Sequence, residues 1–548
     1  MYKLFAVVSV AEMRALEAAA IEAGTPERVL QERAGLAVAD VIEAELAAAG
    51  RRGDRPPRIV VLVGAGNNGR DAVVAGRRLA ARGCEVDMWW GARCPLSDVE
   101  QMDIRFEVIF CGRFDQRYAY GVGALLHESL ERADFAIDGL LGVGMRGMVR
   151  PEYTGVLSAL ASARRRQTGM RIVAVDVPSG VDADTGEIAG MAVDADITVT
   201  FGAVKAGLLL FPGAAHVGRL IPARIGLSSN ASLASGCLIL NERANGIRVP
   251  ARALDAHKYR VGRVLVVAGS DQYVGAACLC SEAAARSGAG LVGLVSTEAV
   301  KRVLAARLPE ATYPLTLTDL DERPEAAADA VAALLPEQSA LLIGPGIGRS
   351  DPMNRFLRQL LTQNAQEERP TPAVIDADAL SLLAGWPRWW EHIGQDNVLT
   401  PHAGEMARLL ASDSELGAVD GEAPWHTARR AAERWRQVIV LKGPFTCVAE
   451  PSPSDDELEP ALVFPFANPA LATAGTGDVL AGLMAGLLAQ GLHPAWAAQL
   501  AVAAHALAAR RAVERHGGRT LLASDLPIEL PAVLAGFAVG DPSVQSYE

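Results

Sequence analysis

An acidic residue follows a glycine-rich turn in the segment Ala472–Gly482, which reads ATAGTGDVLAG. Asp478 stands there at the start of an alanine- and leucine-rich stretch that predicts a helix. The amides of Gly475 to Asp478 would point into one concave spot and, with the helix dipole, bind an anion. An acid beside such a site suits phosphoryl transfer, because it can deprotonate a hydroxyl group while the amides stabilise the moving phosphoryl group. A capped helix start is the alternative, since Thr476 and Asp478 are common capping residues.

Three other segments of the same half carry functional groups at predicted strand ends. LKGPFT, at Leu441–Thr446, places Lys442 where a nucleotide phosphate could bind. TPHAGE, at Thr400–Glu405, places His402 on a loop, and GPGIG, at Gly344–Gly348, is a loop that a ligand can approach closely. A lone histidine is usually structural. Because a proline and a glycine stand near it in the loop, His402 is nevertheless a candidate site residue.

The first half contains three loops with polar side chains after apolar runs. In chain order these loops hold Asn67, Asn68 and Asp71, then Asp138, then Asp176 and Ser179. Each acid alone is best explained as a cap or turn former. In a doubly wound sheet, however, such strand ends converge on one crevice. Amide, carboxylate and hydroxyl oxygens together suit a hard monovalent or divalent cation, so three such loops favour a site.

The elements that must position these loops are alternating strands and helices. Apolar runs such as RIVVLVG, at 58–64, alternate with helical patterns, which is typical of a parallel sheet covered by helices. The pattern lapses from about Gly226 to Pro250 and restarts with GRVLVVAGS. We therefore expect two α/β domains, a Rossmann-like doubly wound parallel sheet in residues 1–228 and a second α/β domain in residues 229–548.

Two helix starts are readable near the N-terminus. Ser9 and Glu12 have the spacing of a capping box. Thr25 followed by Pro26 predicts an N-cap with proline at the first helical position.

The composition and net charge of the chain argue against several classes of protein. The chain has 548 residues, a formal net charge of -12 and 50% hydrophobic residues, which argues against a general nucleic-acid or anionic-membrane binder. No apolar run reaches membrane-spanning length. The seven cysteines are scattered without a CxxC pair, which predicts free thiols in the cytoplasm.

The first half resembles the epimerase domain of the bifunctional NAD(P)H-hydrate repair enzymes, on its GxGNNGxD, DxLxGxG and DxPSG loops within about residues 11–227. The implied reaction interconverts the R and S hydrates of NADH or NADPH, with Asp138 and Asp176 as unranked acid–base candidates. The resemblance implies a potassium ion held by Asn68, Asp138 and Ser179. It implies hydrate contacts from Asn67, Asn68, Gly69, Arg70, Asp71, Gly142, Val143, Gly144, Met145, Arg146, Gly147, Met148 and Asp176.

The second half resembles the ADP- or ATP-dependent NAD(P)H-hydrate dehydratases, which have a ribokinase-like α/β fold. The likeness spans about residues 262–531 and includes GRVLVVAGSDQYVGAA, GPGIG, DADAL, TPHAGE, LKGPFT and NPALATAGTGD in order. It implies hydrate contacts from Ala276 or Ala277, Gly346, Gly348, His402 and Asp478. It implies nucleotide contacts from Lys442, Gly443, Pro444, Phe445, Thr446, Gly475, Thr476 and Gly477. Asp478 would activate the hydroxyl group of the hydrate for phosphorylation.

Together the two resemblances imply substrates, cofactors and assembly. The substrates would be NADHX or NADPHX and an adenine nucleotide, ADP or ATP, with magnesium, and the epimerase half would use potassium. We expect a cytoplasmic homo-oligomer without nucleic-acid or membrane partners. A small-molecule kinase with an accessory domain is one alternative, and a first half that only binds a ligand or partner is another. The NNGRD loop and the TPHAGE loop favour the repair enzyme.

Overall fold

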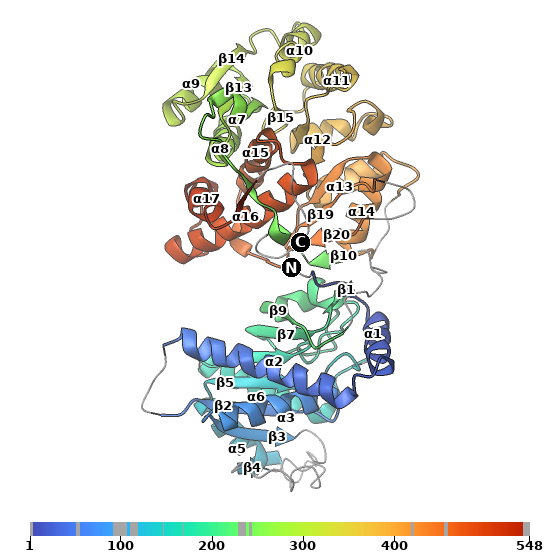
Figure 1. Cartoon of the computed structure of the whole chain (residues 1–548), viewed down its shortest axis with the longest axis vertical. Helices are drawn as coiled ribbons and strands as arrows, with labels where there is room; N and C mark the ends of the chain where they lie inside the picture. The colour runs from blue at the N-terminus through green and yellow to red at the C-terminus, as the bar shows by residue number, and fades with distance from the viewer. Residues whose placement is uncertain are drawn as a thin grey trace. The chain divides into compact units, whose positions relative to one another are not determined.

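The structure is a computed structural model of the whole chain, shown in Figure 1. It describes residues 4–50, 55–90, 107–109, 119–145, 147–167, 169–227, 237–239, 244–417, 421–453 and 459–540. The chain forms two compact units, Phe5–Ser235 and a second unit that combines Gly236–Glu548 with Met1–Leu4. The boundary expected at residues 228 and 229 lies outside the described residues. Among the helices that the structure describes, none is long and apolar enough to span a membrane.

The first unit is built on a seven-stranded parallel sheet, with the strand order β4-β3-β2-β5-β6-β7-β9. Its strands are β2 (Arg58–Val63), β3 (Glu85–Trp90), β4 (Glu107–Ile109), β5 (Phe135–Gly139), β6 (Arg171–Val175), β7 (Ile197–Phe201) and β9 (Arg219–Ala223). A separate parallel pair joins β1 (Val7–Val8) to β8 (Val204–Lys205). The strand order reverses between β2 and β5, and ligands of doubly wound sheets bind at such a switch point.

Helices cover both faces of this sheet (Figure 1). They are α1 (Val10–Glu22), α2 (Glu27–Ala48), α3 (Asn67–Ala81), α5 (Ala119–Arg132) and α6 (Pro151–Arg166), with short 3-10 turns η1 (Ala206–Leu209) and η2 (Gly213–His216). Alternate residues of β2 belong to two different cores, Val61 to one and Leu62 to the other. This explains why the strand reads as a continuous apolar run.

The two predicted helix starts have different outcomes. The capping box of Ser9 and Glu12 is confirmed at the start of α1. The prediction for Thr25 was wrong by one residue, because Pro26 is the N-cap of α2 and makes no side-chain cap hydrogen bond. Proline is thus outside the first helical turn, where its fixed φ suits the extended entry to the helix.

The second unit is built on a ten-stranded sheet with the order β10-β20-β19-β18-β17-β16-β15-β12-β13-β14. Only β19 runs antiparallel to its neighbours. The strands are β10 (Cys237–Ile239), β12 (Arg263–Val267), β13 (Leu291–Ser296), β14 (Thr312–Thr316), β15 (Ala340–Ile343), β16 (Ala373–Ile375), β17 (Val398–Leu399), β18 (Val438–Leu441), β19 (Cys447–Ala449) and β20 (Ala461–Val463). A separate pair joins β11 (Val249–Pro250) to β21 (Val539–Gly540).

The helices of this unit flank the sheet, as Figure 1 shows. They are α7 (Lys258–Val261), α8 (Val274–Arg286), α9 (Glu298–Arg307), α10 (Pro324–Ala332), α11 (Asp351–Gln366), α12 (Asp378–Leu383), α13 (Ala403–Ala411), α14 (Pro424–Trp435), α15 (Thr476–Ala489), α16 (Pro494–His516) and α17 (Leu526–Leu534). The 3-10 turns are η3 (Ala244–Gly246), η4 (Leu335–Glu337), η5 (Trp389–Glu391), η6 (Pro469–Leu471) and η7 (Ala523–Asp525).

Helix α15 lies against α8 with almost no side chain between the two backbones. A β-carbon at Gly482 would lie 2.1 Å from the Cys280 carbonyl oxygen, and one at Gly486 would lie 2.0 Å from Ser287 Oγ. Only glycine allows this close approach. The start of α15, which carries Asp478, is therefore held in a fixed position relative to α8.

Candidate active sites

In the first unit, Asn68 joins the three predicted loops at the switch point. Asn68 is buried near the start of α3, and its Nδ2 donates hydrogen bonds to Val175 O at 2.6 Å and to Leu141 O at 3.2 Å. The loop after β5 packs on the same side chain, because a β-carbon at Gly142 would lie 2.2 Å from Asn68 Oδ1. The amide thus binds the ends of β5 and β6 to the loop after β2.

Asp138 and Ser179 form the buried centre of this loop cluster. Asp138 is completely buried, and its carboxylate accepts hydrogen bonds from Ser179 Oγ at 2.6 Å, Ser179 N at 2.8 Å and Leu140 N at 3.3 Å. Burial raises the pKa of Asp138, while the hydrogen bonds from Ser179 and Leu140 lower it in part. A monovalent cation beside these oxygens would balance the buried charge, so the donor set fits potassium.

Asp176 forms an ion pair with a lysine that lies outside the three predicted loops. Lys205 Nζ lies 2.5 Å from Asp176 Oδ1, and Lys205 is completely buried in the short strand β8. Thr200 Oγ1 and the Phe201 amide also donate to Asp176 Oδ1, at 3.0 and 3.1 Å. The backbone of Asp176 has a φ of 64°, a left-handed conformation that aspartate adopts more readily than most residues.

Asp71 is a third carboxyl group at this site. It is 5% exposed, and its Oδ1 is buried without a hydrogen-bond partner. Burial, then the negative charges of Asp176 and Glu17, raise the pKa of Asp71 to about 8, although Lys205 and Arg70 act in the opposite direction. The group therefore keeps its proton at neutral pH. A buried, protonated carboxyl group beside a charged pair is able to donate a proton.

The remaining predicted residues of the first unit lie around this cluster. Gly69 is buried against the backbone of Gly64, whereas Asn67 and Arg70 are exposed. Val143, Gly144 and Met145 follow Gly142 in a turn closed by the Met145 amide, Gly147 has a φ of 71°, and Met148 is exposed and packs near Gly190. Arg146 lies outside the described residues. Lys205 could have been found as the one charged residue in the otherwise apolar stretch FGAVKAGLLLF.

In the second unit, the geometry at the start of α15 argues against a capping role for Asp478. The N-cap is Gly475, with a φ of 90°, and it provides no side chain. The Thr476 hydroxyl donates to the carbonyl oxygens of Leu471 and Thr473 rather than capping the helix. In the described part of the chain Asp478 has no hydrogen-bond partner, so its carboxylate is free to meet a substrate. Burial and the charge of Asp376 raise its pKa to about 7, and Lys442 acts in the opposite direction.

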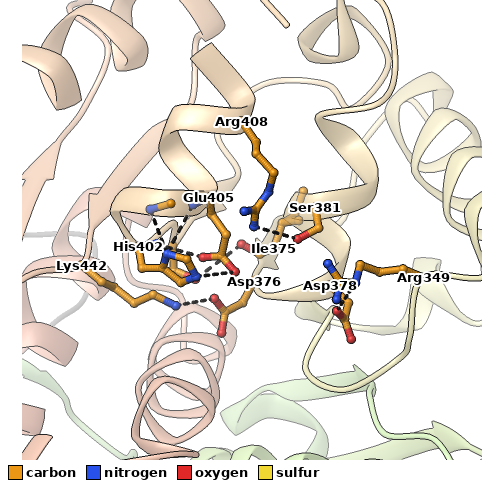
Figure 2. A network of polar contacts seen from close by, with 11 residues as sticks. Arg349, Ile375, Asp376, Asp378, Ser381, His402, Glu405, Arg408 and Lys442 are labelled. Atoms are coloured by element: carbon orange, nitrogen blue, oxygen red, sulfur yellow. Dashed lines mark hydrogen bonds and ion pairs between the residues drawn. The ribbon is translucent and has the colours of Figure 1, made fainter. Parts of the chain in front are cut away.

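Lys442 lies at the same helix start. Its Nζ is 2.7 Å from Asp376 Oδ1 (Figure 2), and a β-carbon at Gly477 would lie 3.4 Å from the same nitrogen. The Lys442 amide donates to Pro401 O at 2.8 Å, which fixes the backbone. Burial lowers the pKa of Lys442, but Asp376, Glu405 and Asp478 together raise it above its ordinary value. The ammonium group is therefore charged and ready to bind a phosphate.

His402 has a structural role in addition to any contact with substrate. Its Nδ1 accepts hydrogen bonds from Gly404 N at 3.0 Å and Glu405 N at 3.3 Å, so the ring caps α13. Its Nε2 lies 3.5 Å from Glu405 Oε1 (Figure 2). The His402 side chain is 56% exposed. Glu405 is buried, and this burial raises its pKa despite the opposing charge of Lys442.

The predicted hydrate-binding residues Ala276 and Gly346 are neighbours. A β-carbon at Gly346 would lie 2.9 Å from Ala276 Cβ, whereas Ala277 is fully buried beside Gly269. Of the two alanines, Ala276 faces the GPGIG loop. Gly348 N donates to Asp378 Oδ2 at 3.0 Å, and Arg349 lies 3.3 Å from the other oxygen of Asp378 (Figure 2).

A small cavity adjoins the predicted nucleotide residues. Gly443, Pro444 and Thr446 line it together with Phe464, Phe466, Asn468, Leu471, Leu480, Val502, His505 and Ala506. Phe445 is not among the lining residues. His505 is buried, and its Nε2 donates a hydrogen bond to Thr476 O at 2.9 Å. This bond connects α16 to the start of α15. His505 lies in the middle of an alanine-rich helical pattern, so its residue type and spacing do not mark it as a site residue.

Comparisons with known proteins match both halves. Residues 264–531 match the family model described as NAD(P)H-hydrate dehydratase, and residues 27–207 match the model described as YjeF-related protein N-terminus. The chain is similar to the bifunctional NAD(P)H-hydrate repair enzyme Nnr of Moorella thermoacetica, with 37% identity over 540 residues and 96% of each chain covered. The enzyme of the same name from Coxiella burnetii is 34% identical over 517 residues, covering 94% of this chain and 96% of that one.

A solved structure is similar to part of the chain. It is the ADP/ATP-dependent NAD(P)H-hydrate dehydratase from Bacillus subtilis, co-crystallized with ATP and Mg2+. The identity is 32%, the match covers 54% of this chain and 97% of that chain, and the TM-score is 0.45.

Proposed function

The chain belongs to the family of bifunctional NAD(P)H-hydrate repair enzymes, and on this basis we propose how its two halves divide the work. Residues 1–228 interconvert the R and S hydrates of NADH and NADPH. Residues 229–548 dehydrate the S hydrate and convert ADP to AMP and phosphate. The epimerase thus turns the R hydrate into the form that the dehydratase consumes.

The observation that carries the dehydratase assignment is the unbonded carboxylate of Asp478 at the start of α15, next to the Lys442 ammonium group. Asp478 takes the proton of the hydrate hydroxyl group, whose oxygen attacks the terminal phosphorus of the nucleotide. The bond from that phosphorus to the bridging oxygen breaks, which releases AMP. The amides of Gly475 to Asp478 and the Lys442 cation stabilise the charge on the moving phosphoryl group.

The second step removes the phosphorylated hydroxyl group. The lone pair of the ring nitrogen expels phosphate, because phosphate is a far better leaving group than hydroxide. Loss of a proton from the neighbouring ring carbon then restores the dihydropyridine. The start of α15 therefore supplies the phosphorylation chemistry of a kinase for a net dehydration.

The substrate contacts of the dehydratase half follow the loops around α15. We propose that Ala276, Gly346, Gly348 and His402 face the hydrate together with Asp478. The nucleotide would be held by Lys442, Gly443, Pro444, Phe445, Thr446, Gly475, Thr476 and Gly477. The cavity beside Thr446, with its two phenylalanines, offers an apolar space near these residues. Magnesium would enter on the nucleotide phosphates as part of this substrate.

In the epimerase half, Asn68, Asp138 and Ser179 would hold a potassium ion. The ion would balance the buried charge of Asp138 and hold the three loops in register. Both oxygens of Asp138 accept hydrogen bonds, whereas among the described residues the hydrogen bonds to Asp176 all reach Oδ1, which leaves its second oxygen open to a substrate. Asp176, paired with Lys205, is therefore our candidate for the acid–base group.

Hydrate contacts in this half would come from the loops at the switch point. They are Asn67, Asn68, Gly69, Arg70, Asp71, Gly142, Val143, Gly144, Met145, Arg146, Gly147, Met148 and Asp176. Expulsion of the hydroxyl group by the ring nitrogen and return of water to either face would interconvert the two hydrates. We also propose that the protein is a homo-oligomer and that it is cytoplasmic. The free thiols of Cys84, Cys237, Cys278, Cys280 and Cys447 support the second of these proposals.

The test of this function uses a mixture of R and S NADH hydrates. The purified chain, potassium, magnesium and ADP are added, and the dihydropyridine absorbance is followed together with AMP and phosphate. Full recovery with one AMP and one phosphate for each NADH supports both activities. Recovery of the S fraction alone refutes the epimerase assignment. No recovery with either ADP or ATP refutes the dehydratase assignment and favours a kinase with another substrate.

A further inference from the structure

Asp376 is a buried carboxylate in the dehydratase half that the proposed reaction does not yet use. It follows strand β16 and is 1% exposed. Its Oδ1 lies 2.7 Å from Nζ of Lys442, which follows strand β18 (Figure 2). Strand β17 lies between these two strands in the sheet, so the ion pair crosses over the end of β17. Such a contact fixes the relative position of two separate loops.

The backbone around Asp376 is held in a costly conformation. Ala377 has φ 53° and ψ -117°, a region that an alanine rarely adopts. The Asp376 amide donates to Ile343 O at 3.1 Å, and a β-carbon at Gly344 would lie 1.9 Å from the Asp376 carbonyl oxygen. Strain of this kind persists only where the surrounding structure enforces it, and it is concentrated at functional sites. Here it fixes the backbone from which the Asp376 carboxylate meets Lys442.

The position of Lys442 needs an anion to hold it. Its Nζ lies next to Gly477 in the first turn of α15, where the helix dipole is positive and repels a cation. Without a partner, a flexible lysine would move its charge away from the helix start. Asp376 is the group within hydrogen-bond distance that opposes this repulsion.

We propose that Asp376 is a positioning residue of the dehydratase, which holds the Lys442 ammonium group against the start of α15 so that the nucleotide phosphates meet a preformed cation. This inference rests on the proposed roles of Asp478 and Lys442. Asp376 would touch neither the hydrate nor the nucleotide. It would act through Lys442 and through its own negative charge beside Asp478.

Several other titratable side chains face this site. Asp478 is influenced by Asp376, Lys442 and Asp378, and Cys280 lies close to it on α8. Lys442 is influenced by Asp376, Glu405 and Asp478, with His402 beside Glu405 and His505 on α16 below. Burial is the largest cause of the raised pKa of Asp478, and the negative charge of Asp376 is the second largest. An amide in its place removes that charge but still accepts a hydrogen bond from Lys442.

Two substitutions therefore separate position from charge. In Asp376→Ala the acceptor is lost, so the KM for ADP should rise by about tenfold or more. In Asp376→Asn the KM for ADP should change less, while the acidic limb of the kcat/KM profile for the hydrate should move to lower pH by about one unit. The ionisation of ADP is common to all variants, so a difference between profiles reports a protein group.

Asp413→Asn is the matched control. Asp413 is also buried, at 2% exposed, and pairs with Arg434 at 3.2 Å and with Trp435 Nε1 at 3.0 Å. Its loss should lower the melting temperature without changing the KM for ADP or the pH profile. The full-length chain is used throughout, with potassium and magnesium constant and the S hydrate of NADH as substrate.

The inference is overturned if Asp376→Ala leaves the KM for ADP unchanged, or if Asp376→Asn leaves the acidic limb in place. If Asp376→Ala does not fold, the pH profile of Asp376→Asn decides alone. Asp478→Ala, measured in parallel, separates this result from a failure of the proposed function. An inactive Asp478→Ala with normal Asp376 variants removes only the role of Asp376. Normal dehydration by both Asp478→Ala and the Asp376 variants removes the phosphorylation mechanism as well.

Discussion

Replacing Asp71 by asparagine should stabilise the first unit at neutral pH and weaken epimerisation. Asp71 is 5% exposed, has a buried oxygen without a partner, and has a pKa raised from 3.8 to about 8, mainly by burial and by Asp176. The folded protein therefore holds a proton that the unfolded chain releases above about pH 4. Folding stability must fall as the pH rises from about 4 to about 8. Asparagine removes this dependence, because it has no proton to gain.

The magnitude follows from the difference between pH 7 and the unfolded pKa of 3.8. At about 1.4 kcal/mol for each pH unit, the carboxyl group destabilises the fold by about 4 kcal/mol at pH 7. Because the amide is also a buried polar group, we expect a net gain of about 2 to 4 kcal/mol at pH 7 and of less than about 1 kcal/mol at pH 4. For a unit of this size, that is a rise in melting temperature of about 4 to 16 °C at pH 7.

Differential scanning calorimetry of the full chain at pH 4, 5.5 and 7 measures this effect. Asp134→Asn is a control of opposite sign in the same unit, because Asp134 is buried but accepts hydrogen bonds from Arg55 and from Arg58 N. Asp134→Asn should lower the melting temperature of the same transition that Asp71→Asn raises. This opposite shift identifies that transition as the unfolding of the first unit. The reasoning is refuted if Asp71→Asn leaves that transition unchanged or lowers it at pH 7, or if the gain is the same at all three pH values.

Three further predictions concern the two reactions. Asp478→Ala should lower the dehydration rate by ~100-fold or more and leave epimerisation unchanged, as measured with S hydrate alone and with R hydrate alone; near-normal dehydration would exclude Asp478 as the base. Asp138→Ala should lower the epimerisation rate and leave dehydration unchanged. Replacing potassium by a larger organic cation should reduce epimerisation by the original chain but should have no further effect on this variant. The kcat/KM for dehydration should fall about tenfold for each pH unit below about 7, because Asp478 must lose its proton to act and its pKa is raised to about 7 by burial and Asp376; a rate that stays constant down to pH 5 would contradict this.

The loops could be predicted from sequence because parallel strands bring their ends together. Asn68, Asp138 and Ser179 are far apart in the chain, yet the pattern of apolar runs and glycine turns was enough to expect them at one edge of a sheet. The charged partners were not predictable in this way. Lys205 lies in β8, which pairs with β1 outside the main sheet, and its partner Asp176 is 29 residues away in the sequence. No periodicity encodes such a tertiary contact.

Asp376 illustrates a different limit. It belongs to the DADAL motif, whose spacing alone indicates no function for its first aspartate. Its function depends on the ion pair across the end of β17 and on the unusual backbone of Ala377, and both arise from packing. Helix starts show the same limit on a smaller scale. The N-cap expected at Ser9 is confirmed, whereas the N-cap expected at Thr25 lies one residue later, at Pro26.

The glycine contacts between α15 and α8 have a consequence for the energetics of catalysis. Backbone lies on backbone at Gly482 and Cys280, so the first turn of α15 has little freedom to tilt or slide. In water, the dipoles around a phosphoryl group must reorient as its charge changes, and that reorganisation adds to the barrier. The amide dipoles of Gly475 to Asp478 are oriented when the chain folds, and the cost of their alignment is met by packing. A larger residue at Gly482 should therefore slow the reaction by raising its reorganisation energy, even though position 482 touches no substrate.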